Sequence, residues 1–130
     1  MSRTGTFCLD VMSYIKQDHP FVVPTTDGKL IEEHFGLATS KDEAISIAHM
    51  IAPKGWSEPF QNPAFDEYTL VSRGKKLFEV DGQKVEVSAG QSILIKKGSR
   101  VRYSNPFEEE CEYWSVCIPA FSPMSAHREV

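Results

Sequence analysis

The two side chains best suited to acid–base chemistry in this sequence are a carboxylate and a phenol, Glu67 and Tyr103. Glu67 begins a predicted strand over residues 67–72, and strand alternation places it on the same face as Thr69 and Val71. A carboxylate buried on such a face must be paired, hydrogen-bonded or protonated, and those conditions suit a general acid or base. Tyr103 follows Val101 by two residues, so the two share a strand face, where the phenol can donate a hydrogen bond or transfer a proton.

A structural role is the alternative for each of these residues. Glu67 would then be bonded to a neighbouring amide or tyrosine, and Tyr103 would be a core aromatic residue with a satisfied hydroxyl. Trp56 either walls a ligand pocket or caps the core, whereas Trp114 is expected in the core. Cys111 and Cys117 have no base beside them in sequence and are interpreted as small buried hydrophobic residues. Neither thiol is therefore expected to be a nucleophile.

The elements that must position these side chains are typical of an all-β domain. From Phe21 onward, short β-branched or aromatic runs alternate with glycine, proline and Asp-Gly turns, which indicates a sandwich or barrel. The clearest signal is KKLFEVDGQKVEV, in which Asp81 and Gly82 can form a two-residue turn that pairs residues 75–80 with 83–87. Further strands are predicted over residues 30–35, 44–51, 67–72, 92–95, 100–103 and 112–118. A short amphipathic helix over residues 8–16 is a weaker prediction, based on apolar residues spaced by three.

Size and composition favour one soluble domain. The chain has 130 residues, a net charge of -4 and no basic cluster, so we expect no nucleic-acid partner. Its three cysteines include no CxxC pair, which predicts neither a disulfide framework nor a zinc site and favours a reducing, cytoplasmic setting. No apolar run approaches the length of a membrane span or a signal peptide, so we expect no membrane association and no export.

The spacing of glycines and polar residues between Gly55 and Asn105 resembles the two conserved motifs of the cupin superfamily. The first motif is glycine, five residues, His-x-His, three or four residues, glutamate, six residues, glycine. Gly55, Glu67 and Gly74 occupy its fixed places, while Gln61 and Pro63 stand at its histidine positions.

The second motif is glycine, five residues, Pro-x-Gly, two residues, histidine, three residues, asparagine. Gly90, Gly98 and Asn105 match it, while Lys96 replaces the proline and Val101 the histidine. The resemblance implies a single-domain cupin, a double-stranded β-helix or jelly-roll barrel, with Glu67 and Tyr103 facing its interior. The region over residues 61–121 is similar to the histidine-poor cupins that include the ethanolamine-utilisation Q type.

The resemblance also implies where a metal would bind. Metal-binding cupins hold a divalent ion with three imidazoles and one carboxylate, and only the carboxylate, Glu67, is retained here. We therefore expect no metal cofactor; the alternative is a divalent metal held by Glu67 with non-standard ligands. All four histidines lie outside the motifs, and His49 is expected to pack on a strand rather than to ligate.

These observations lead to a functional hypothesis with alternatives. We expect a metal-independent barrel pocket, lined by Trp56, Gln61, Glu67, Val101 and Tyr103, that binds a small polar metabolite. If the protein is an enzyme, a lyase or isomerase with Glu67 as proton acceptor and Tyr103 as its partner fits best. A non-catalytic binding or accessory cupin is the alternative, and a divalent-metal enzyme with recruited ligands is a third.

The chain is expected to fold as one domain with three parts and to form a dimer. Residues 1–35 are expected to form an N-terminal segment with a short helix and an edge strand, residues 36–119 the barrel, and residues 120–130 a tail. The strand over residues 29–35 could pair across a two-fold axis, which predicts a homodimer.

Overall fold

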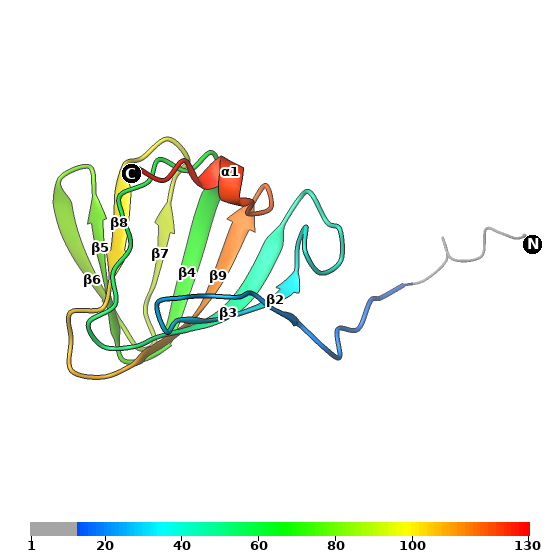
Figure 1. The fold of residues 1–130 in the computed structure, drawn as a ribbon, viewed down its shortest axis with the longest axis horizontal. Coiled ribbons are helices and arrows are strands. Elements are labelled where there is room, and N and C mark those ends of the chain that lie inside the picture. Colours follow the sequence, from blue (N-terminus) through cyan, green and yellow to red (C-terminus); the bar gives the residue numbers. More distant parts are fainter. Residues whose placement is uncertain (1–12) are drawn as a thin grey trace, which may run out of the picture.

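The computed structural model describes residues 13–130, and these residues form an almost all-β domain (Figure 1). Its strands are β1 (Phe21–Val22), β2 (Leu30–Phe35), β3 (Ser46–Ala52), β4 (Asp66–Arg73), β5 (Lys75–Val80), β6 (Gln83–Ser88), β7 (Ser92–Ile95), β8 (Val101–Ser104) and β9 (Cys111–Ile118). A four-residue helix, α1 (Pro123–Ala126), follows β9. The predicted all-β class is confirmed, and most strand bounds match the sequence prediction to within one or two residues.

The strands form two antiparallel sheets that enclose the barrel interior. The larger sheet has the order β1-β2-β3-β9-β4-β7, and the smaller one has the order β6-β5-β8. Figure 1 shows the smaller sheet at the left and the larger sheet curving away from it. The chain runs from β4 directly into β5, and so passes from one sheet to the other, as in the jelly-roll barrel that the motifs implied.

The hairpin between β5 and β6 has the predicted turn. Val80 pairs with Gln83, and the two residues between them, Asp81 and Gly82, have φ angles of 47° and 86°. Positive φ at both central positions is the geometry of a type I′ turn, which matches the twist of the two strands. Local sequence therefore fixes the register of this hairpin.

Two of the motif anchors have a structural purpose. Gly74, between β4 and β5, has a φ of 77°, and a Cβ at this position would collide with the backbone oxygen of Glu110. Asn105 is fully buried, and its Nδ2 donates to the carbonyl oxygens of Ala52 at 3.2 Å and Glu109 at 2.8 Å. Both residues hold connections of the barrel in place and do not reach the cavity.

β2 and the C-terminal stretch both form backbone hydrogen bonds with the rest of the barrel. β2, placed by the sequence in an N-terminal segment ending at residue 35, pairs with β3 on one side and with β1 on the other. The expected tail returns along residues 60–64, where Ala64 donates to the Ser125 carbonyl at 2.9 Å. Of the predicted helix over residues 8–16, residues 8–12 lie outside the described part, and residues 13–16 form no helix.

The outer face of the larger sheet presents large apolar side chains to solvent. They come from three neighbouring strands, β4, β7 and β9, and are 36–48% exposed: Tyr68, Leu70, Leu94, Trp114 and Ile118. Register brings Leu70 opposite Trp114 and Tyr68 opposite Leu94, so the residues are neighbours. This apolar face differs from the strand edge at residues 29–35 that the sequence indicated for pairing with a second copy.

Candidate functional site

A cavity of about 420 Å³ lies in the barrel interior. This volume is within the range of roughly 300–1,000 Å³ that is usual for small-molecule sites. Its apolar walls come mainly from β2, β3 and the segments that flank β4 and follow β9, and polar side chains project into it from opposite sides. The described polar and charged residues that line it are Lys29, Glu33, Ser46, Glu58, Gln61, Glu67, Lys76, Tyr103, Ser115, Ser122 and Arg128.

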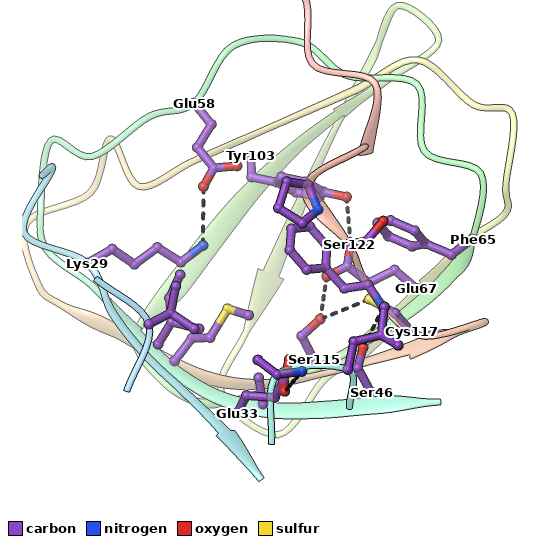
Figure 2. A pocket seen from close by; sticks show the side chains of 18 of the residues that line it. Lys29, Glu33, Ser46, Glu58, Phe65, Glu67, Tyr103, Ser115, Cys117 and Ser122 are labelled. Atoms are coloured by element: carbon purple, nitrogen blue, oxygen red, sulfur yellow. Dashed lines mark hydrogen bonds and ion pairs between the residues drawn. The ribbon is translucent and has the colours of Figure 1, made fainter. Parts of the chain in front are cut away.

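Glu67 lies at the centre of a hydrogen-bonded cluster on one side of this cavity (Figure 2). The Tyr103 hydroxyl donates to Glu67 Oε1 at 2.6 Å, and the Ser115 hydroxyl donates to Glu67 Oε2 by a short bond. Ser115 is brought there by β9, which pairs with β4 so that Thr69 lies opposite Ser115. The carboxylate is only 8% exposed, and its two donors replace the water that burial removes.

The environment of this cluster keeps two neighbouring acids protonated. Burial, reinforced by the charge of Glu67, raises the pKa of Tyr103 well above its ordinary value. Burial and the same carboxylate also raise the pKa of Cys117 far above that of a free thiol. Tyr103 is thus a hydrogen-bond donor to Glu67 near neutral pH, and Cys117 is a neutral thiol and not a thiolate nucleophile.

A buried ion pair, which the sequence analysis did not predict, lies on the other side of the cavity (Figure 2). Lys29 Nζ is 3.3 Å from Glu58 Oε2, and the two side chains are 7% and 10% exposed. Burial lowers the pKa of Lys29, but the neighbouring Tyr113 and Glu58 outweigh it and raise the pKa above its ordinary value. Arg128 approaches the other oxygen of Glu58 at 3.7 Å. The cavity therefore has polar groups at two ends with apolar walls between them.

Lys76 is a further lining residue that the sequence did not predict. It is 2% exposed, and its Nζ lies 3.6 Å from the ring centroid of Tyr113 and 4.7 Å from that of Tyr103. Alternation along β5 was the available signal, because it places Lys76 on the same face as the fully buried Phe78. A lysine on the apolar face of a strand is unusual and indicates a specific role.

The structure separates the predicted pocket residues into two groups. Gln61, Glu67 and Tyr103 line the cavity, and the buried Gln61 Oε1 has no hydrogen-bond partner among the described residues. Trp56 and Val101 are not among the described residues that line the cavity, which corrects their predicted place in the pocket. Val101 is fully buried in the core, and the Trp56 indole donates outward to Asp27 at 2.8 Å because a buried N–H needs an acceptor.

The donor set at the motif positions does not fit the metal site of the metal-binding cupins. Both oxygens of Glu67 accept hydrogen bonds, and neither Pro63 nor Val101 has a side-chain donor atom for a metal. Only the Gln61 oxygen remains, and a single amide oxygen is a weak ligand for a transition metal. Over residues 13–130, no group of three or more histidine, cysteine, aspartate or glutamate side chains is arranged to hold a metal.

His49 lies outside the cavity, on the outer face of β3. Its ring nitrogens contact Glu32 Oε1 at 2.9 Å and Glu112 Oε2 at 2.6 Å, and its ring lies 5.1 Å from that of Trp114. Partial burial lowers the pKa of His49, but the hydrogen bonds to the Glu32 and Glu112 carboxylates raise it by a larger amount. The pKa of His49 is therefore above its ordinary value. This environment is a structural ion-pair network on the sheet surface.

Comparison with known proteins gives a family and several relatives. The model of the cupin domain family matches residues 48–118, which contain the cavity residues of β4, β5, β8 and β9 and, on β3, Ala48 and Met50. A protein of Myxococcus xanthus named endoribonuclease YbeY is 47% identical over 108 residues, covering 83% of this chain. The chain spans only 37% of that protein's length, so the name describes a protein of which most lies outside the match.

Solved structures agree with the family match. The EutQ protein of Clostridium difficile is 26% identical, with a TM-score of 0.58 over 73% of this chain and 72% of that one. PAC13 of Streptomyces, whose structure contains uridine, has a TM-score of 0.71 over 92% of both chains at 14% identity, which shows the fold alone. Among the described residues, no helix is long and apolar enough to cross a membrane. The chain belongs to the cupin family and, within it, resembles the EutQ type.

Proposed function

We propose that the barrel cavity binds a small polar metabolite without a metal ion, and that Glu67 accepts a proton from it in a lyase or isomerase reaction. The observation that carries the proposal is the position of Glu67, a buried carboxylate on the wall of a cavity of about 420 Å³. A convergent set of polar groups in an otherwise apolar pocket is typical of ligand sites. The unpartnered Gln61 oxygen supports a ligand that has a hydrogen-bond donor of its own.

The hydrogen bonds of Glu67 suit a proton acceptor held in one orientation. Each oxygen accepts one bond, from Tyr103 or Ser115, and a carboxylate oxygen has a second lone pair free for a substrate proton. The two donors fix the carboxylate plane, so a bound substrate meets a preoriented base. Since the Tyr103 pKa is raised, its phenol acts as a positioning donor and keeps its own proton at neutral pH.

The first experiment is Glu67→Gln, compared with the exposed surface variant Glu86→Gln. Glutamine preserves the size of the side chain and removes its charge and basicity, so the fold should persist while ligand binding or turnover is lost. The measurement is calorimetric titration and product analysis with metabolites that copurify with the protein or stabilise it against heat. Wild-type affinity and turnover in Glu67→Gln would refute the proposal, and a loss in Glu86→Gln as well would show that the effect is not specific to the cavity.

Elemental analysis tests the metal-independent part. Since Glu67 is the only member of the usual ligand set that is retained, the protein as purified should contain well under one equivalent of transition metal. Stoichiometric metal, with activity lost on chelation and regained on adding the ion, would contradict it and favour a metal enzyme with non-standard ligands.

A second candidate is a binding module without catalysis. It is favoured by the relative from Myxococcus xanthus, in which the region similar to this chain is 37% of a longer protein named endoribonuclease YbeY. A ligand that binds the cavity with Glu67-dependent affinity but is recovered unchanged after long incubation would favour this candidate over the enzyme.

A further inference from the structure

Most charged side chains that line the cavity already have a hydrogen-bond or ion-pair partner within the protein. Among the described lining residues there are three cations, and two of them, Lys29 and Arg128, approach the Glu58 carboxylate at 3.3 and 3.7 Å. Glu58 is a carboxylate with two oxygens, and one cation lies near each. These cations therefore already have an anion in the protein and do not require one from a ligand.

The remaining carboxylates of the cavity are satisfied by neutral donors. Glu33 accepts from the Thr39 hydroxyl at 2.8 Å and the Ala38 N–H at 3.0 Å. Glu67 accepts from the hydroxyls of Tyr103 and Ser115. Neither carboxylate forms an ion pair with a lysine or arginine of the described chain, and neither lacks hydrogen-bond partners.

Lys76 is left as the cation without an acceptor. It is 2% exposed, it lines the cavity, and none of the described side chains or carbonyls accepts a hydrogen bond from its Nζ. Aromatic rings surround the ammonium, with centroids at 3.6 Å for Tyr113, 4.7 Å for Tyr103 and 5.0 Å for Phe78. The faces of aromatic rings stabilise a cation but provide no lone pairs for its three N–H donors.

We infer that the ligand of this cavity is a small carboxylate whose anionic group pairs with the Lys76 ammonium. The inference rests on the proposed small-molecule site and specifies the chemical class that it binds. An ammonium that is largely removed from water, and that has neither an acceptor nor an anion among the described residues, is costly. Because Lys76 lines the cavity, a ligand carboxylate there would provide both.

A monoanion fits this position better than a dianion. Lys76 is the one unpaired cation of the described lining, and Glu67 adds a negative charge to the same cavity. The described lining includes the N-terminus of the four-residue helix α1, at Ser122 and Pro123. Pro123 has no N–H, and the Ser125 N–H donates to the Ser122 hydroxyl at 3.1 Å, so this end does not supply the set of free N–H donors that phosphate sites usually require. One ammonium balances one carboxylate, whereas a phosphate monoester would leave an uncompensated charge in a confined space.

Matched pairs of small ligands test the inference on the full chain. Acetate, lactate, butyrate and benzoate are each compared with the corresponding primary amide, which has nearly the same shape and no charge. Dissociation constants are measured by calorimetry or ligand-observed NMR. For the best pair, the wild type should bind the carboxylate about tenfold more tightly or better, the factor that one charge-assisted hydrogen bond supplies.

Variants of Lys76 assign that preference to its charge. Lys76→Met should reduce the ratio between carboxylate and amide to about one, and Lys76→Arg should retain most of it. Lys75→Met, which changes the exposed neighbour on the opposite face of β5, should bind as the wild type does. Lys76→Gln repeats the test without the charge if Lys76→Met does not fold, as judged by circular dichroism.

The outcomes separate this inference from the function on which it rests. Equal binding of every carboxylate and its amide by the wild type, or a preference that survives in Lys76→Met or Lys76→Gln, overturns the inference. If neutral or cationic metabolites bind with Glu67-dependent affinity while no carboxylate does, the small-molecule site stands and the carboxylate class is wrong. If no compound of any class binds, both proposals fail.

Discussion

Replacing Tyr103 by phenylalanine tests the Glu67 cluster most directly, because it removes a single hydroxyl and keeps the ring. The Tyr103 hydroxyl donates to Glu67 Oε1 at 2.6 Å, and both residues are buried, at 4% and 8% exposure. The ring of Tyr103 packs edge-on against Phe78, and phenylalanine preserves that contact. The change in stability therefore isolates the hydrogen bond to the carboxylate.

The expected magnitude follows from the charge and burial of this bond. A hydrogen bond to a charged group contributes about 1.5–3 kcal/mol, and water cannot easily replace the lost donor at a buried site. For a chain of 130 residues, 1 kcal/mol corresponds to a Tm change of about 4 °C. Tyr103→Phe should therefore lower the Tm by about 6–12 °C.

The assay is equilibrium unfolding in urea, followed by circular dichroism, together with calorimetric Tm values. Tyr14→Phe is the matched control, because Tyr14 is 74% exposed and lies outside the apolar outer face, so this change should alter stability by less than about 0.5 kcal/mol. Equal effects of the two substitutions would refute the argument that the Tyr103 hydroxyl stabilises a buried carboxylate.

The same residue predicts a dependence on alkaline pH. Burial and the charge of Glu67 raise the pKa of Tyr103 above its ordinary value of 10.0. Above about pH 10 the unfolded chain loses this proton while the folded chain keeps it, so stability is full below that pH and falls as the pH rises. Tyr103→Phe should make the stability less steep in this range, and an unchanged slope would contradict the raised pKa.

Three further predictions concern other parts of the barrel. The His49 ring should titrate above its ordinary pKa of 6.5 by NMR, so that its contribution to stability is full below about pH 6.5 and lost as the pH rises through the folded value; Glu112→Gln should lower this pKa, and a wild-type value at or below 6.5 would contradict the ion-pair network. Gly74→Ala should destabilise more than Gly90→Ala in urea, because both glycines have positive φ but only at Gly74 does a Cβ collide with backbone; equal losses would show that φ strain alone matters. The protein should form a homodimer through the apolar outer face of the larger sheet, and Leu70→Lys should reduce its mass in light scattering to that of one chain; a monomeric wild type would rule this out.

The local sequence was sufficient to predict the strands and their turns. Alternation and Asp-Gly punctuation predicted the β5–β6 hairpin with its register, since a two-residue turn leaves no freedom in the pairing. The spacing of the glycines and Asn105 predicted the family, because a turn that needs a glycine or a buried amide constrains a single position that can be recognised in the sequence. The sequence also placed Glu67 and Tyr103 on inward faces through the resemblance to cupins.

Which side chains meet inside the barrel was decided only by the tertiary structure. Tyr103 and Ser115 reach Glu67 from 36 and 48 residues away, through strand pairings that no local pattern reveals. Trp56, which follows the first motif's glycine, and Val101, which stands at the second motif's histidine position, both pack in the core instead. The Trp56 indole donates its N–H to Asp27, away from the cavity. Lys76 became a candidate once the partners of all its neighbours were known. A charge without an acceptor is a property of the whole surrounding shell and not of any segment.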